Sequence, residues 1–369
     1  MKILHIYKDY YPVLGGIENH LHALAEGLAA RGHDVTVLVA NPDARTVTRT
    51  FNGVHVVKAG RWATLASTPV GPAMLWQMRR LPADIAHLHF PYPFGDVAHT
   101  LLGRAQRTVI TYHSDIVRQK NLLRVYAPWL RRTLNQADRI IATSPRYVNT
   151  SPFLAPHAQK CSVIPYGIDI ARFMNADPDL VQRIRAQYGT PLILFVGQLR
   201  YYKGVEFLIR AMTHVPGRAL LIGGGTTTRR AELENIARDL GVADRVVLLG
   251  EKDTERPAFY HACDVFVLPS IERSEAFGIV QLEAMAAGRP VISTEVGTGT
   301  SWVNLDGQTG LVVPPRDVEA LARAINVLLN DDARRRRMGQ AAQRRVTTEF
   351  TVETMLNRTE TVYQSLIER

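Results

Sequence analysis

The sequence predicts an α/β protein made of two doubly wound domains, each a parallel β-sheet covered by helices on both faces. Three observations support this prediction. Short apolar segments of strand length alternate with longer amphipathic segments of helical length, as in parallel sheets. The alternation starts again after residue 190. The length of 369 residues also exceeds what a single hydrophobic core usually holds.

Residues 1–168 are expected to form the first domain. A strand over 2–7 leads through a loop to an amphipathic helix over 17–30, which closes at Gly32. The remaining strands are expected at 34–40, 54–57, 84–90, 109–113, 139–144 and 162–165. Helical segments are expected around Trp76 and over 116–135.

Residues 169–190 are polar and include Asp177-Pro178, so they are expected to be an irregular linker. Residues 191–350 are expected to form the second domain. Its strands are expected at 191–196, 219–222, 246–249, 264–269 and 290–294, with a helix over about 277–287. The final segment, 351–369, is expected to be a single helix.

Composition indicates an ordinary globular protein, because 46% of residues are hydrophobic and 21% are charged. No apolar run approaches the length of about 18 residues that a membrane-spanning helix needs. The first residues read directly as a strand, without a signal-peptide pattern. Cys161 and Cys263 have no metal-site spacing and are expected to be reduced, which favours a cytoplasmic location.

Positive charge is concentrated in the first half of the chain. Residues 1–170 contain 19 Lys and Arg against 10 Asp and Glu, or +9, whereas residues 171–369 contain 25 against 24, or +1. A basic half often faces an anionic surface. Nucleic acid would also explain the charge, but no nucleic-acid motif is present, so none is expected as a partner.

Two carboxylates frame the start of the helix expected after residue 276. Glu275 precedes this helix, and Glu283 lies about two turns along it. They are about 80° apart around the axis and about 10 Å apart along it, which suits two ends of an activated sugar better than one metal ion. The N–H groups between them lack intrahelical partners and suit a phosphate. They belong to Phe277, Gly278, Ile279 and Val280.

This segment, Glu275-x7-Glu283 with Ala-Phe-Gly-Ile-Val inside it, resembles the signature of glycosyltransferase family 4. The resemblance implies a GT-B fold, in which two Rossmann-like domains face each other across a cleft and the C-terminal helix crosses back to the N-terminal domain. It implies that 1–168 is the acceptor-side domain and that 191–350 binds the nucleotide sugar. It also implies that Glu275 contacts the donor sugar, that the Phe277–Val280 backbone holds the diphosphate, and that Glu283 binds the ribose hydroxyls.

Further motifs fit the same family. Gly15-Gly16 resembles its N-terminal loop, although a tight strand-to-helix turn would also explain the pair. His113, at the end of a strand, falls where the family has a histidine near the donor sugar, or it is simply a packed polar residue. Lys252 lies where the family surrounds the base.

Arg200 and Lys203 are candidates to hold the diphosphate, with two surface cations as the alternative. Lys203-Gly204 matches the family. The sequence departs from it at Gln198, where many members have Arg, and does not say whether Arg200 compensates.

The stretch 116–132 contains five cations and no acid after Ile116: Arg118, Lys120, Arg124, Arg131 and Arg132. Apolar residues recur in it at helical spacing, and Pro128 should bend the element. Such a segment can lie on an anionic bilayer or contact a lipid diphosphate. The alternative is an ordinary helix packed on the sheet with a basic outer face.

Together these features predict a retaining hexosyltransferase that uses a nucleoside diphosphate sugar, with GDP-mannose first and a UDP-hexose second. The acceptor would be a lipid-linked or growing polysaccharide, and the enzyme would be cytoplasmic or peripheral on the inner face of the cell membrane. The family implies no bound metal and no cofactor. Two alternatives stay open: a GT-B nucleotide-sugar epimerase and a non-catalytic nucleotide-sugar-binding protein. The sequence does not specify the oligomeric state.

Overall fold

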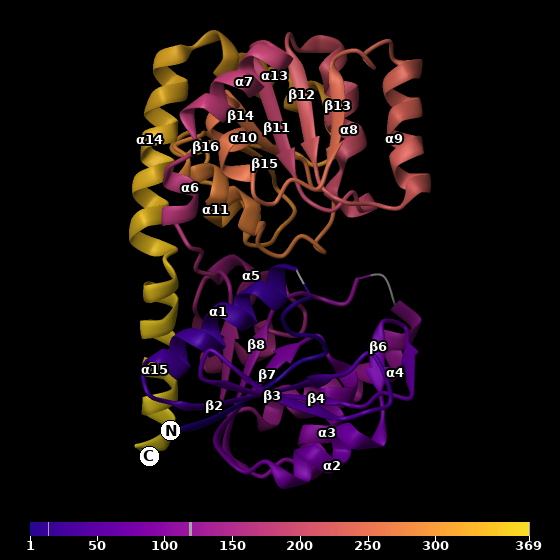
Figure 1. The fold of residues 1–369 in the computed structure, drawn as a ribbon, viewed down its shortest axis with the longest axis vertical. Coiled ribbons are helices and arrows are strands. Elements are labelled where there is room, and N and C mark those ends of the chain that lie inside the picture. The colour runs from indigo at the N-terminus through magenta and orange to yellow at the C-terminus, as the bar shows by residue number, and fades with distance from the viewer. Residues whose placement is uncertain (14, 118–119, 369) are drawn as a thin grey trace. The chain divides into compact units, whose positions relative to one another are not determined.

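A computed structural model describes residues 1–13, 15–117 and 120–368. The chain divides into two compact units (Figure 1). Unit 1 comprises Met1–Gly167 and Val352–Arg369, and unit 2 comprises Ile168–Thr351. Each unit is a mainly parallel sheet with helices packed against it.

Unit 1 contains an eight-stranded sheet in the order β10-β9-β8-β7-β1-β2-β4-β3. Seven of the strands are parallel: β1 Lys2–Ile6, β2 Asp34–Ala40, β4 Val54–Ala59, β7 Ala83–Phe90, β8 Ala105–Tyr112, β9 Arg139–Ala142 and β10 Cys161–Val163. Strand β3, Val47–Phe51, runs antiparallel to β4 at the edge. A separate hairpin joins β5, Ala63–Leu65, to β6, Thr68–Val70. The expectations above missed β3 and β5, whose exposed positions lack the apolar pattern of a buried strand, and β6, which is only three residues long.

The central strands β1, β7 and β8 place chemically important residues in register. His5 on β1 pairs with His87 on β7, and His89 pairs with Thr111 on β8. The helices of unit 1 are α1 Gly16–Ala30, α2 Pro72–Arg80, α3 Pro93–Leu102, α4 Lys120–Gln136, α5 Pro145–Thr150, the 3-10 helix η1 Ala155–Lys160 and α15 Val352–Ile367.

The C-terminal helix α15 packs against α1 within unit 1 (Figure 1). Arg31, just after α1, bonds Glu353 at 2.6 Å and Glu360 at 2.7 Å, and His33 also contacts Glu360 at 2.7 Å. These contacts attach residues from the end of the chain to the first domain.

Unit 2 contains a six-stranded, fully parallel sheet in the order β13-β12-β11-β14-β15-β16. The strands are β11 Leu192–Val196, β12 Arg218–Ile222, β13 Val246–Gly250, β14 Val265–Leu268, β15 Val291–Thr294 and β16 Gly310–Val313. The helices are α6 Ala171–Met174, α7 Pro178–Tyr188, η2 Tyr201–Lys203, α8 Val205–Ala211, η3 Met212–His214, α9 Thr227–Asp239, α10 Arg256–Ala262, α11 Ile279–Ala286, α12 Thr300–Val303, α13 Val318–Asn330 and α14 Asp332–Glu349. The last strand, β16, was not predicted.

The expectation of an irregular linker over 169–190 is wrong, because α6 and α7 form there and belong to unit 2. Asp177 caps α7 by accepting a hydrogen bond from the Asp179 N–H, and Pro178 occupies the first helical position. Asp-Pro is therefore a helix start here rather than a loop signal. Ile184 of α7 is buried, and α7 packs against α10.

No helix in the described part of the chain is long and apolar enough to cross a membrane. Cys161 and Cys263 are both free thiols.

Candidate functional site

Lys203 and Glu275, which are 72 residues apart in the sequence, form an ion pair in unit 2. Lys203 ends η2 after β11, and Glu275 lies between β14 and α11. Because β11 and β14 are neighbours in the sheet, their connections meet at its carboxyl edge. Lys203 Nζ lies 2.5 Å from Glu275 Oε2, which also accepts a hydrogen bond from Ser270 Oγ at 3.0 Å.

The pair is nearly enclosed, since Glu275 is only 7% exposed. Burial lowers the pKa of the Lys203 ammonium, but the charge of Glu275, the influence of Tyr202 and the hydrogen bond to Glu275 together outweigh burial, so the net shift of the pKa is upward. Lys203 therefore stays charged at neutral pH. Thr298 Oγ1 donates to the backbone carbonyl of Glu275 at 2.6 Å, which fixes the loop that carries the carboxylate.

Helix α11 begins at Ile279, two residues later than expected. Gly278 is its N-cap and has a φ of 76°, a left-handed conformation that favours glycine. Phe277 is buried and packs against Trp302 and Phe350. Of the four N–H groups proposed for a phosphate, those of Ile279 and Val280 are therefore the ones at true helical positions, where no preceding turn supplies a carbonyl.

Glu283 lies in the middle of α11 and is 7% exposed. Its Oε2 accepts a hydrogen bond from the Tyr260 hydroxyl at 2.8 Å and lies 3.6 Å from Arg256 Nη1. Burial raises the pKa of the Glu283 carboxyl, and the Arg256 charge partly opposes this. The sequence interpretation missed both partners, because only the packing of α10 against α11 reveals them.

The other two cations proposed from the sequence, Arg200 and Lys252, differ in their surroundings. Arg200 is exposed, yet it is close enough that its charge lowers the pKa of Lys203. Lys252 instead pairs with Glu255 at 2.8 Å, in the segment after β13. Gln198, at the position where many family members have Arg, donates to Glu251 at 3.2 Å.

In unit 1, His113 follows β8 and is buried. Both of its ring nitrogens have partners: Nδ1 lies 2.6 Å from the Tyr166 hydroxyl, and Nε2 lies 3.0 Å from His89 Nδ1. His89 Nε2 in turn lies 3.0 Å from His5 Nδ1. His113 is thus one link in a chain of hydrogen-bonded rings.

Gly15 is the N-cap of α1, and Gly16 is its first residue. A Cβ built on Gly15 would lie 2.2 Å from a carboxylate oxygen of Glu18. The glycine therefore permits the Glu18 side chain to approach the backbone at the start of α1.

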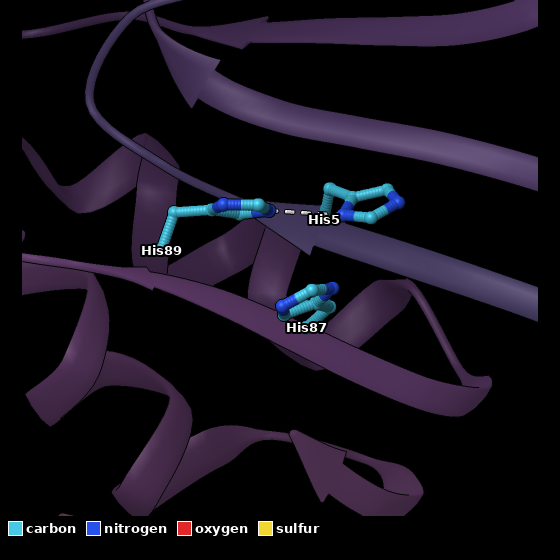
Figure 2. Close-up of side chains that lie close together, drawn as sticks. All are labelled: His5, His87 and His89. Carbon is cyan, nitrogen blue, oxygen red and sulfur yellow. Dashed lines mark hydrogen bonds between the residues drawn. The ribbon is translucent and has the colours of Figure 1, made fainter. Parts of the chain in front are cut away.

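Five buried histidines gather around this chain: His5, His20, His87, His89 and His113. Burial is the largest cause of a lowered pKa in all five, so they are neutral at physiological pH. Figure 2 shows the bond between His89 and His5, with His87 nearby and not bonded to either.

Two groups within this cluster have enough nitrogens for a metal ion: His5, His87 and His89, and His20, His89 and His113. Their geometry favours hydrogen bonding instead. His87 and His89 stack at 4.5 Å and 25°, so their in-plane lone pairs do not converge on one point. The ring planes of His89 and His113 differ by only 12°, and their facing nitrogens lie 3.0 Å apart. This distance fits an N–H···N hydrogen bond, which leaves neither nitrogen free for a metal ion. The sequence interpretation overlooked this cluster, although the alternation of His87 and His89 on one face of a strand was a usable signal.

Comparison with known proteins identifies the family. Residues 178–345 match the family model described as Glycosyl transferases group 1, and residues 14–172 match the one described as Glycosyltransferase Family 4. The chain is 37% identical over 371 residues to O-antigen chain mannosyltransferase C of Escherichia coli, covering 100% of this chain and 99% of that protein. The chain is a family 4 glycosyltransferase.

This glycosyltransferase is also 39% identical over 356 residues to D-rhamnosyltransferase WbpZ of Pseudomonas aeruginosa, covering 95% of this chain and 92% of that protein. Among solved structures, sucrose-phosphate synthase from Thermosynechococcus elongatus matches with a TM-score of 0.83 at 24% identity, covering 100% and 99% of the two chains. WaaG, a glycosyltransferase involved in lipopolysaccharide biosynthesis, matches with a TM-score of 0.75 at 20% identity, covering 99% of each chain. These likenesses confirm the predicted GT-B fold with two Rossmann-like domains, and the relatives confirm the predicted enzyme class.

Proposed function

We propose that this glycosyltransferase transfers a hexose, with mannose as the first candidate, from a nucleoside diphosphate sugar to a hydroxyl of a polysaccharide or lipid-linked acceptor. The observation that carries the proposal is the Lys203–Glu275 pair beside the start of α11, with Glu283 about one turn into the helix. This cluster offers a cation, unpaired helix N–H groups and two carboxylates, which match the diphosphate and the hydroxyls of such a donor.

Lys203 and the N–H groups of Ile279 and Val280 would stabilise the charge that develops on the departing diphosphate. Arg200 would add a second cation from the rim. Glu275 would hold the sugar through its remaining carboxylate lone pairs, and Glu283, oriented by Tyr260, would accept hydrogen bonds from the ribose hydroxyls. Lys252 would lie near the base.

The reaction would proceed with retention of the anomeric configuration. The bond from the anomeric carbon to the phosphate oxygen breaks, and its electron pair leaves with the diphosphate. The acceptor oxygen attacks the same face of the sugar, and its proton passes to the departing phosphate oxygen. This route needs no covalent nucleophile on the protein.

Relatives support the choice of donor and acceptor. One is named GDP-mannose-dependent alpha-(1-6)-phosphatidylinositol monomannoside mannosyltransferase, from Mycolicibacterium smegmatis, and is 34% identical over 366 residues, covering 92% of each chain. An O-antigen mannosyltransferase is also among them. GDP-mannose is therefore the first donor candidate, and a UDP-hexose is the second.

A donor screen followed by product analysis tests the proposal. GDP-, UDP- and ADP-sugars are compared by thermal shift, because a ligand at about 100 times its dissociation constant stabilises the folded state by about 3 kcal/mol. The best donor is then incubated with mannosylated acceptors, and the product's anomeric configuration is read by NMR. An inverted product would refute retention, and free sugar released without acceptor would favour the epimerase alternative. Donor binding without any turnover would favour a binding protein.

The outer face of α4 supports a peripheral membrane location. The side chains of Leu130 and Leu134 on its apolar side are buried, whereas Arg124 on the outer side is exposed. Trp129, Arg131 and Arg132 line an open hollow on this surface. Arg118 and the Lys120 side chain, which were part of the predicted basic stretch, lie outside the described residues. An exposed aromatic beside cations suits anionic headgroups or a lipid diphosphate.

Co-sedimentation with vesicles of phosphatidylglycerol or of phosphatidylcholine tests this location. We expect binding to the anionic vesicles that decreases with added salt. Replacement of Arg124, Arg131 and Arg132 by Gln should weaken it. No binding at low salt, or equal binding by the triple variant, would reject the role of α4.

A further inference from the structure

His20 has no hydrogen-bond partner for either ring nitrogen among the residues that the structure describes. It lies in the second turn of α1 and is 8% exposed. A neutral imidazole carries one donor and one acceptor, and leaving both unpaired in a buried place is costly. The lack of partners for His20 is explained if a bound ligand supplies the missing hydrogen bonds.

The neighbours of His20 are already engaged. Its ring lies edge-on to His113, with centroids 5.2 Å apart, and to His89, with centroids 5.9 Å apart. Each of those two rings uses both nitrogens within the chain that joins His5 to Tyr166. Neither can turn toward His20 without breaking a bond of that chain.

His87, in contrast to His20, has a partner for each of its ring nitrogens. His87 Nδ1 lies 2.5 Å from the Tyr363 hydroxyl, and its Nε2 lies 2.6 Å from Thr111 Oγ1. His20 belongs to the same cluster and is buried to a similar degree, but its nitrogens receive no such partners. His5 leaves its Nε2 unpaired but keeps a bond through Nδ1, so among the described residues His20 is the member of the cluster with both ring nitrogens unpaired.

The place of His20 in the fold is one where ligands bind. Helix α1 follows the loop after β1, and His113 follows β8, so both rings lie at the carboxyl edge of the unit 1 sheet. Ligands of open parallel sheets bind at this edge.

We propose that His20 forms a hydrogen bond with a hydroxyl of a sugar substrate, in a subsite of unit 1 at the carboxyl edge of its sheet. This inference rests on the proposed glycosyl transfer. A hydroxyl both donates and accepts, so it can use either nitrogen of a neutral imidazole. Burial lowers the pKa of His20 to about 3, so the ring offers no positive charge to a phosphate. His113 then forms the wall of the subsite and holds the neighbouring ring in place, rather than contacting the hydroxyl itself.

Three variants test the inference. His20→Phe keeps a ring and removes both nitrogens, and His20→Gln keeps a donor and an acceptor. His87→Phe is the matched control, because it makes the same change at a histidine whose nitrogens are partnered within the protein. We expect His20→Phe to fold with an unchanged or higher melting temperature and to lower kcat/KM about 5- to 100-fold, the effect of leaving a substrate hydroxyl unpaired. His20→Gln should recover most of the rate, and His87→Phe should lower the melting temperature.

Binding constants and KM values of the His20→Phe variant show whether the hydroxyl belongs to the donor or to the acceptor. A donor hydroxyl predicts weaker binding of the nucleotide sugar with unchanged binding of the free nucleoside diphosphate. An acceptor hydroxyl predicts a higher KM for the acceptor alone. Both outcomes support the subsite.

Unchanged kcat/KM and unchanged binding in His20→Phe would overturn the inference and leave a buried water as the partner of His20. Stoichiometric Zn²⁺ binding by the wild type that is lost in His20→Phe would also overturn it. Failure of the proposed function looks different: the wild type itself would bind no nucleotide sugar and transfer none.

Discussion

The five buried histidines should make unit 1 sensitive to mild acid. In the folded state they stay neutral, because burial lowers the pKa of His5 and His20 to about 3 and those of His87, His89 and His113 well below the ordinary value of 6.5. In the unfolded chain they titrate near 6.5. As the pH falls through 6.5, the unfolded state takes up protons that the folded state does not, so the stability of unit 1 falls with pH.

The size of the effect follows from linkage. Between pH 7.5 and 5.5 each histidine with an unfolded pKa near 6.5 and a folded pKa far below it costs about 1.4 kcal/mol, or about 7 kcal/mol for the five. Asp96 opposes this. Burial raises its pKa to about 7, so the folded state gains a proton there and recovers about 2 kcal/mol over the same range. His99, whose pKa burial lowers to about 4, adds about 1.3 kcal/mol, so the expected net loss for unit 1 is about 6 kcal/mol. This loss is comparable to the whole stability of a small domain.

Hydrogen exchange of the β1 and β7 amides measures this stability in unit 1 without a contribution from unit 2. Exchange is followed by mass spectrometry at increasing denaturant, at pH 5.5 and 7.5, with correction for the intrinsic exchange rates. His20→Phe removes one titrating group and should reduce the loss by about 1.4 kcal/mol. Asp96→Asn removes the opposing group and should increase it. A free energy of unfolding that changes by less than about 1 kcal/mol between the two pH values would show that the histidines are not held neutral.

Three further predictions concern unit 2. Lys203→Met should cost about 3 kcal/mol by leaving the Glu275 carboxylate buried without its cation, and adding Glu275→Gln should recover much of this; both are measured by urea denaturation. Glu283→Gln should weaken nucleoside diphosphate binding about 10-fold in calorimetry, because a charged acceptor becomes neutral. Gly278→Ala should cost about 1–2 kcal/mol, because its φ is 76° and a Cβ would lie 2.6 Å from the Leu268 side chain.

Each of these predictions has an outcome that would contradict it. Equal stabilities for Lys203→Met and the wild type would mean that the pair is fully solvated. Glu283→Gln with wild-type nucleotide affinity would remove Glu283 from the binding site. A fully stable Gly278→Ala would mean that the turn before α11 relaxes freely.

The features that the sequence predicted well are those encoded within a few neighbouring residues. Apolar alternation located most buried strands to within a few residues, and the segment from Glu275 to Glu283 placed its two acids correctly before and within α11. The misread element also follows from local chemistry. Asp177-Pro178 starts a helix as readily as it forms a turn. The structure distinguishes the two, because Ile184 is buried on a helix that packs against α10.

Contacts between distant residues could not be predicted, because they depend on the order of strands in the sheet. The pairing of Lys203 with Glu275 requires β14 to lie beside β11, although two strands intervene in the sequence. The bond from His5 to His89 likewise requires β7 to pair with β1. A sequence with alternating strands and helices predicts that the strands are parallel but leaves several orders open.

The two units differ in the polar groups that they bury, and this difference helps to explain why positive charge is concentrated in the first half of the chain. Unit 2 buries charged groups in pairs, such as Lys203 with Glu275, and its residues are nearly neutral overall. In unit 1 the histidines at the carboxyl edge of the sheet are neutral, so the excess of positive charge in residues 1–170 comes from lysines and arginines elsewhere, including the exposed face of α4. We infer that this excess serves an anionic surface rather than the donor diphosphate, for which the paired groups of unit 2 suffice. If so, neutralising Arg124, Arg131 and Arg132 should leave turnover of a soluble acceptor unchanged and reduce turnover only when the acceptor is presented in an anionic membrane. Equal losses with both acceptors would instead place these cations at the site of transfer.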